Sequence, residues 1–261
     1  MVVTQFKPKS KKPKVLKTAF VLAAGKGTRL KPLTDTCPKP LISVAGQPAL
    51  LRILHQLEEA GVEEVVINLQ YLGDQIEHAI WMAQMAGQLQ RLNIQFSYEA
   101  DLLETGGGLK HALPLLPDGP FYVINSDAIW DELHAPVLPQ LAAQFDENLM
   151  TTLLAVVPTE SIGAFRQGGD FNMSPAGLLR FATDKATAPY VYCGIHVTTP
   201  DVVEDWPLEA FSLAMPWRDL AKEGRLHGSL YTGRWADMGT PAGLEAAHTI
   251  AAAQTTEKKR A

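Results

Sequence analysis

A glycine-rich loop that directly follows an apolar run is the feature that most constrains how this chain can fold. Residues 18–23 predict a fully buried β-strand, and the chain continues as Ala24-Gly25-Lys26-Gly27-Thr28-Arg29. Loop glycines allow backbone N–H groups to approach phosphate oxygens closely, and Arg29 adds a positive charge. A second cation, Lys39, follows in the segment Pro38-Lys39-Pro40-Leu41. The pattern therefore predicts a nucleotide-binding loop in which Arg29 and Lys39 neutralise a triphosphate.

Two better-known phosphate-binding motifs do not fit this loop. A dinucleotide-binding fingerprint requires glycine or alanine at position 30 and an acidic residue at the end of the second strand, where this chain has Leu30, Asn68 and Gln70. A P-loop requires Gly-Lys-Ser/Thr at a spacing that is absent here. A purely structural turn would explain the glycines but not the added Arg29 and Lys39.

Composition places the chain among globular proteins. Of its 261 residues, 46% are hydrophobic and 20% are charged, so a sizeable core can form and global disorder is excluded. Charged residues interrupt or flank every apolar run, which excludes a membrane helix. Residues 7–25 imitate a secretory signal, but cleavage after Ala24 would destroy the loop. Cys37 and Cys193 are too few for a disulfide framework. We therefore expect a cytoplasmic protein.

The charge is unevenly distributed along the chain. The net charge is −5, but six lysines lie within residues 7–17, ahead of the first acidic residue, Asp35, and without these six, 17 basic against 28 acidic residues leave −11. A body this acidic has no footprint for nucleic acid, which requires a basic face. We expect a disordered basic tail over residues 1–17, one domain over residues 18–253 and a second disordered tail over residues 254–261.

Short β-rich runs alternate with helical periodicity, which predicts an α/β fold with a Rossmann-like, mixed but mostly parallel sheet flanked by helices. The expected strands are 18–23, 65–69, 94–98, 121–125, 150–157, 190–197 and 226–232. The expected helices are 48–60, 74–85, 107–116, 217–223 and 240–253, the last capped by Thr240 with Pro241 in its first turn. The strand ending at Asn125 should lie beside the first strand, where α/β sheets bind ligands.

The segment from 158 to 190 is rich in Gly, Pro, Ser and Asp and has weak periodicity, which predicts hairpins and loops. We expect a small β-rich insertion at about 158–198 that binds an acceptor substrate.

Several segments resemble, in the same order, the signature of the sugar-1-phosphate nucleotidyltransferases, the enzymes that make nucleotide-sugars. The resemblance extends from about residue 19 to 250 and is greatest to short bacterial members that act on N-acetylmuramate 1-phosphate or mannose 1-phosphate. Two positions depart from the usual pattern, since Ser126 replaces a common glycine and Gly106 a common alanine. The matching segments are Gly25–Leu30 with Pro38–Leu41, Leu103–Gly108, Asn125–Asp127 and Trp235–Pro241.

The resemblance implies a nucleotide-diphospho-sugar transferase fold and a role for each matching residue. Arg29, Lys39, Asp127 and Asp237 would be catalytic, with Asp127 and Asp237 holding Mg²⁺. The sugar phosphate would bind at Lys185, Tyr192 and Gly194. The nucleotide would bind at Leu22, Ala23, Ala24, Gly25, Gly27, Thr28, Glu104, Thr105, Gly107 and Asn125.

The implied reaction joins a nucleoside triphosphate to a sugar 1-phosphate and releases pyrophosphate. UTP is the first choice of donor because the Ala-Ala-Gly-Lys-Gly loop is of the type seen in uridylyltransferase relatives, whereas GTP and dTTP remain open. The alternatives are a mannose-1-phosphate guanylyltransferase, a cytidylyltransferase for an alcohol phosphate, and a non-catalytic nucleotide-sugar sensor. The expected partners are small-molecule substrates, with no nucleic acid and no membrane, and the expected state is a monomer or weak homodimer.

Overall fold

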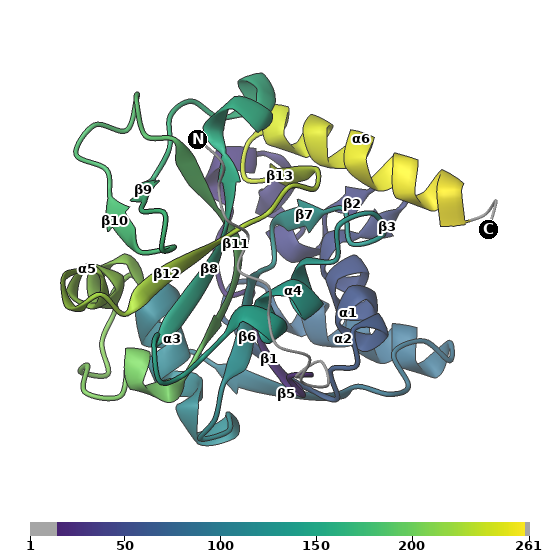
Figure 1. Cartoon of the computed structure of the whole chain (residues 1–261). Helices are drawn as coiled ribbons and strands as arrows, with labels where there is room; N and C mark the ends of the chain where they lie inside the picture. Colours follow the sequence, from purple (N-terminus) through teal and green to yellow (C-terminus); the bar gives the residue numbers. More distant parts are fainter. Residues whose placement is uncertain (1–14, 259–261) are drawn as a thin grey trace.

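The computed structural model describes residues 15–258 as a twisted sheet covered by helices on both faces (Figure 1). Within these residues the main sheet has nine strands, of which seven follow the order β10-β9-β11-β6-β1-β4-β5, while β8 pairs with β11 and β12 pairs with β8. The strands are β1 (Thr18–Leu22), β4 (Glu64–Leu69), β5 (Asn93–Tyr98), β6 (Phe121–Asn125), β8 (Thr152–Pro158), β9 (Phe171–Met173), β10 (Leu179–Phe181), β11 (Tyr190–Thr198) and β12 (Leu226–Leu230).

The helices and the small two-stranded sheets complete the fold. The helices are α1 (Ala49–Glu59), α2 (Gly73–Met85), α3 (Glu104–Ala112), α4 (Val137–Gln144), α5 (Ala214–Glu223) and α6 (Pro241–Lys258). The small sheets pair β2 (Ser43–Val44) with β3 (Gln47–Pro48), and β7 (Ala128–Trp130) with β13 (Trp235–Asp237).

The first half of the chain forms the parallel part of the sheet. Strands β6, β1, β4 and β5 all run in the same direction, and β1 lies between β6 and β4. Strand β11 is antiparallel to both β6 and β8, so the sheet is mixed. These pairings confirm the predicted fold class and the predicted neighbours of the first strand.

Burial on both faces explains why the first strand has an unbroken apolar sequence. Ala19 and Val21 belong to the core cluster that packs against α1, α2 and α4, whereas Phe20 belongs to the cluster beneath α3 and α5. Successive side chains of a strand point to opposite faces, and here both faces are covered.

Most predicted elements are present, although several boundaries differ. Helix α3 begins at Glu104 rather than at residue 107, and α5 begins at Ala214 rather than at 217. The amide of Gly243 donates to Thr240 Oγ1 at 3.1 Å, which confirms the predicted cap of the last helix. Helix α4 and the paired strands β7 and β13 were not predicted.

The ends of the folded region lie outside the predicted limits of 18 and 253. Leu16 is only 4% exposed and belongs to the core, although it falls within the predicted basic tail. At the other end, α6 continues to Lys258 because Gln254 is buried and its Nε2 donates to the carbonyl of Trp130 at 2.7 Å. The remainder of the two predicted tails, residues 1–14 and 259–261, lies outside the described residues.

None of the helices within residues 15–258 combines the length and the apolar character that crossing a membrane requires.

The last turn of α6 is expected to contribute to stability. Truncation after residue 253 removes the buried Gln254 hydrogen bond and the contact between Glu257 and His134, so the free energy of unfolding should fall by about 1–2 kcal/mol. The measurement is urea unfolding of both lengths, with truncation after Lys258 as the control. Equal stability of the two truncated chains would show that residues 254–258 add nothing to the fold.

Candidate active site

The candidate site lies where the parallel strands β1 and β6 end. Leu22 and Asn125 are paired in register, so the glycine-rich loop after β1 and the Asn125-Ser126-Asp127 segment leave the sheet side by side. The amide of Ser126 donates to the carbonyl of Leu22 at 3.1 Å and holds the two exits together. The pairing of the buried strands β1 and β6 therefore places Asp127 beside the glycine-rich loop.

The small sheet of β7 and β13 brings Asp237 to Asp127. In this antiparallel pair Asp237 is opposite Ala128, the neighbour of Asp127. The amide of Met238 donates to the carbonyl of Asp127 at 3.0 Å, and the amide of Gly239 donates to Asp237 Oδ1 at 2.7 Å. Two carboxylates that are distant in sequence thus share one corner of the site.

Two cations balance these carboxylates. The ammonium of Lys39 lies 2.5 Å from Asp127 Oδ2, and both side chains are largely buried. The Arg29 guanidinium packs beside Gly239, because a Cβ built on that glycine would lie 2.6 Å from Arg29 Nη2 and 2.7 Å from Asp237 Oδ1. The structure therefore brings the four predicted catalytic residues, Arg29, Lys39, Asp127 and Asp237, into one cluster.

The two carboxyl groups differ in their proton affinity. Burial alone would raise the pKa of Asp127, but the charge and hydrogen bond of Lys39 outweigh it and hold that pKa below its ordinary value. Burial, followed by repulsion from Asp127, raises the pKa of Asp237. The cluster therefore has one strongly paired carboxylate and one whose charge costs free energy until a further cation arrives.

The predicted phosphate loop has no room for a side chain at Gly27, whereas the space around Gly25 is empty. Gly27 has φ of 62°, and an added Cβ would lie 2.9 Å from Thr34 Cγ2 and 3.0 Å from Lys39 Cβ, so glycine is required for the close approach of Lys39. Nothing lies within 4 Å of a Cβ built on Gly25. Lys26, Thr28 and Arg29 are exposed, so this loop presents its backbone and cations outward.

A buried polar network supports the loop from beneath. The amide of Ala23 donates to Asn68 Oδ1 at 2.7 Å, and Asn68 Nδ2 donates to Glu99 Oε1 at 2.6 Å. The other oxygen of Glu99 accepts from the amide of Leu103 at 3.0 Å. The network connects the loop after β1 with the start of α3, and Glu99 was not among the predicted site residues.

The predicted base-binding segment makes contacts of its own. Thr105 Oγ1 accepts from the amide of Leu213 at 2.9 Å, and the amide of Gly107 donates to the carbonyl of Phe211 at 3.2 Å. A Cβ on Gly107 would collide with the carbonyl of Glu209. Glu104 begins α3 with φ of 59°, a strained conformation for a residue with a side chain. Packing against residues 209–213 is therefore a structural reason for having threonine at 105 and glycine at 107. Nucleotide binding by these residues stays a prediction.

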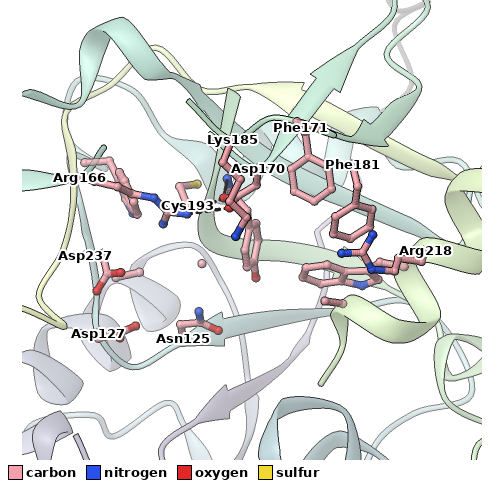
Figure 2. A pocket seen from close by; sticks show the side chains of 17 residues that line it. Asn125, Asp127, Arg166, Asp170, Phe171, Phe181, Lys185, Cys193, Arg218 and Asp237 are labelled. Carbon is pink, nitrogen blue, oxygen red and sulfur yellow. Dashed lines mark hydrogen bonds and ion pairs between the residues drawn. The ribbon is translucent and has the colours of Figure 1, made fainter. Parts of the chain in front are cut away.

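A cavity of about 290 Å³ opens beside the carboxylates. Asp127 and Asp237 lie at one end of it, Asn125 lies further along its wall, and Lys185 reaches it from the segment after β10 (Figure 2). Tyr192 and Gly194 line the same cavity, so all three predicted sugar-phosphate residues face the space next to the cluster. Gly194, with φ of 77°, stands at a bulge of β11 where an added Cβ would lie 3.2 Å from Asn125 Cβ.

Other residues of the cavity wall were not predicted. Arg166 and Asp170 form an ion pair at 2.7 Å, and Asp170 also accepts from the amide of Tyr192 at 3.1 Å. Most of the missed residues come from segments 158–182 and 214–218, where no motif marks a cavity wall. Trp235 lies in the matching segment Trp235–Pro241, but no role was predicted for it. The full set that was missed is Ala128, Arg166, Asp170, Phe171, Phe181, Ala182, Cys193, Ala214, Trp217, Arg218 and Trp235.

The hydroxyl of Tyr192 is hydrogen-bonded to a buried histidine, His196. Tyr192 Oη lies 2.7 Å from His196 Nδ1, and both rings meet the Trp217 indole edge-on. Burial lowers the pKa of His196 to about 3, so the imidazole is neutral at ordinary pH. His196 therefore fixes the orientation of the aromatic wall without adding charge.

Asp127 and Asp237 fit a metal ion that is completed by substrate. Within residues 15–258 no group of three or more His, Cys, Asp or Glu side chains could hold a metal by itself. Mg²⁺ usually takes one or two protein carboxylates and fills its shell with water and substrate phosphates. The raised pKa of Asp237 also indicates a place where a cation would be stabilising.

Comparison with known proteins agrees with this fold. The nucleotidyl transferase family matches residues 18–165, and the chain belongs to that family. It is a nucleotidyltransferase enzyme, and its relatives act on small-molecule substrates. Members of the family generally use a divalent metal ion.

Two curated relatives and one solved structure illustrate the similarity. The chain is 40% identical to N-acetylmuramate alpha-1-phosphate uridylyltransferase of Caulobacter vibrioides over 86% of its length and 93% of the relative. It is 36% identical to the protein of the same name from Neisseria meningitidis serogroup B, over 90% and 98% of the two lengths. A UDP-glucose pyrophosphorylase structure with UDP-glucose superposes with a TM-score of 0.73 at 18% identity, covering 93% of this chain and 99% of the other.

Replacing Asp127 or Asp237 should lower activity in both cases but change stability in opposite directions. Asp127→Asn and Asp237→Asn should each reduce kcat at least about a hundredfold, because each would remove one of the two carboxylates predicted to hold the metal ion. Without metal, Asp237→Asn should raise the melting temperature, since it removes a charge that burial and Asp127 oppose, whereas Asp127→Asn should lower it by depriving Lys39 of its partner.

The measurements are steady-state kinetics and thermal unfolding in the presence of a chelator. The stability of the metal-free protein should also depend on pH. Because the pKa of Asp237 is raised in the folded state, its carboxylate destabilises the metal-free fold as pH rises through that pKa, and this loss of stability should be absent in Asp237→Asn. Near-normal turnover in either variant would remove that residue from the site.

Proposed function

We propose that the enzyme transfers a uridylyl group from UTP to a sugar 1-phosphate, with N-acetylmuramate 1-phosphate as the first choice of acceptor. A phosphate oxygen of the acceptor attacks the α-phosphorus, the bond from that phosphorus to the bridging oxygen breaks, and pyrophosphate leaves. The observation that carries this proposal is the cluster of Arg29, Lys39, Asp127 and Asp237 at the mouth of a cavity lined by Lys185 and Tyr192.

Each residue of the cluster has a task in this reaction. Arg29, exposed on the loop, is suited to bind the leaving β- and γ-phosphates, and the backbone of Gly25 and Gly27 to approach the triphosphate. Lys39 screens the attacking phosphate from the α-phosphate. Asp127 and Asp237 would hold Mg²⁺, which supplies charge neutralisation for the phosphates.

The acceptor would occupy the cavity formed largely by the insertion at about 158–198. Lys185 is suited to bind the sugar phosphate, and Tyr192 to pack against the sugar ring. On the other side, Leu22, Ala23, Ala24, Thr28 and Asn125 surround the loop exit where the nucleotide would bind. The base would lie near the start of α3, at Glu104, Thr105 and Gly107.

The choice of UTP and of the acceptor rests on the relatives, since both curated proteins above are named as uridylyltransferases for N-acetylmuramate 1-phosphate. UTP is a cytoplasmic metabolite, and a muramic acid derivative comes from cell wall, so the proposal implies cell wall recycling in the cytoplasm. A guanylyltransferase is the second candidate, because the chain is 30% identical to a mannose-1-phosphate guanylyltransferase subunit of Danio rerio, although it spans only 61% of that relative.

The proposal is tested by pairing donors with acceptors. Of the four ribonucleoside triphosphates, UTP with Mg²⁺ should give the largest thermal shift, and pyrophosphate should appear only when a sugar 1-phosphate is added. N-acetylmuramate 1-phosphate should give the highest kcat/KM, and Asp127→Asn serves as the inactive control. A larger response to GTP with mannose 1-phosphate would favour the guanylyltransferase, and the absence of pyrophosphate with every pair would indicate a nucleotide-sugar sensor.

Lys39 distinguishes catalysis from binding alone. Lys39→Ala should lower kcat by about a hundredfold or more, while the affinity for nucleotide falls less because Arg29 and the loop amides still hold the triphosphate. Lys31→Ala is the matched control, since Lys31 is exposed and paired with Asp35, and it should leave kcat within about twofold. Unchanged kcat in Lys39→Ala would move the role to Lys26 or Lys31.

A further inference from the structure

The end of the cavity opposite the carboxylates contains an arginine supported by an aromatic ring. Arg218, on α5, places its guanidinium carbon 4.1 Å from the centre of the Phe181 ring on β10. Figure 2 shows Arg218 and Phe181 at one end of the cavity and Asp127 and Asp237 at the other, with Asn125 between them. One ligand group therefore cannot occupy both ends at once.

Most charges around the cavity already have partners within the protein. Lys39 is paired with Asp127, and Arg166 is paired with Asp170 through two hydrogen bonds of 2.7 and 2.8 Å. Within residues 15–258, neither Arg218 nor Lys185 has a carboxylate partner. Two cations at the wall are thus available to a ligand, and one acceptor phosphate accounts for only one of them.

The geometry of Arg218 favours a carboxylate over a hydroxyl. The Phe181 ring supports the Arg218 guanidinium without neutralising its charge, and the N–H groups of the guanidinium can still make two parallel bonds to a planar anion. A neutral sugar hydroxyl would satisfy one donor and leave the charge unpaired.

We propose that Arg218 is a specificity-determining residue that binds a carboxylate carried by the acceptor sugar at a position remote from its 1-phosphate. The acceptors selected in this way are acidic sugar 1-phosphates, such as one whose hexosamine ring carries a lactyl ether, and neutral hexose 1-phosphates are disfavoured. This inference rests on the proposed function, because it assigns a second anionic group to the same acceptor.

The test compares Arg218→Gln with wild type on two acceptors that differ by the acidic substituent. N-acetylmuramate 1-phosphate has the lactyl carboxylate, and N-acetylglucosamine 1-phosphate lacks it. For the first, Arg218→Gln should raise KM by about ten- to a hundredfold; for the second, KM should stay within about twofold. Arg218→Lys, which keeps the charge but not the fork, should give an intermediate loss.

Arg180→Gln is the matched control, because Arg180 precedes Phe181 on β10, is exposed, and alternates to the other face of that short strand. It removes the same charge nearby and should leave both KM values within about twofold. A similar change in Arg180→Gln and Arg218→Gln would show a general field effect and overturn the inference. An equal loss for both acceptors in Arg218→Gln, or no loss for either, would also overturn it.

Equilibrium binding separates failure of this inference from failure of the proposed function. Isothermal titration with the two sugar phosphates needs no turnover, so it reports on Arg218 even if wild type releases no pyrophosphate. Tighter binding of the acidic sugar phosphate by wild type, lost in Arg218→Gln, supports the assignment. Equal affinity of wild type for the two sugar phosphates refutes it, whatever the reaction is.

Discussion

The repulsion between Asp127 and Asp237 is the constraint around which the site is organised. Two carboxylates in one largely buried corner are unfavourable by themselves, and the protein opposes this cost with Lys39, Arg29 and the amide of Gly239. The compensation is incomplete, because the pKa of Asp237 remains raised. That residual cost makes the metal-free cluster a good receptor for a divalent cation and for the phosphates that accompany it.

The elements that position the loop are readable from sequence because each depends on local or short-range patterns. Phe20 and Val21 face two different cores, so β1 needs an unbroken apolar run, which the sequence displays. Thr240 and Pro241 mark the start of α6 by capping chemistry. The glycines before Arg29 mark the predicted phosphate loop, since φ of 62° at Gly27 is readily adopted by that residue type.

The rest of the site depends on contacts that leave little trace in the sequence. Strands β7 and β13 have three residues each, too few for a periodic pattern, yet their register sets Asp237 beside Asp127 across 110 positions of sequence. The cavity wall leaves equally little trace, because Arg166 and Asp170 pair within a segment of loops and a short hairpin. Resemblance to a family supplied Asp237 as a candidate, whereas nothing in the local sequence marked Arg218 or Trp217.

The pairing of β7 with β13 also links the site to the dynamics of the chain. The strand β13 leads directly into α6, and α6 packs on β7 as well as on β13. Local opening of this C-terminal unit would separate the two aspartates while leaving the parallel sheet folded. A ligand that requires both aspartates must then slow that opening. Amide hydrogen exchange in β13 and α6 would therefore report whether a ligand is bound at the site, although most of the site lies at the ends of β1 and β6.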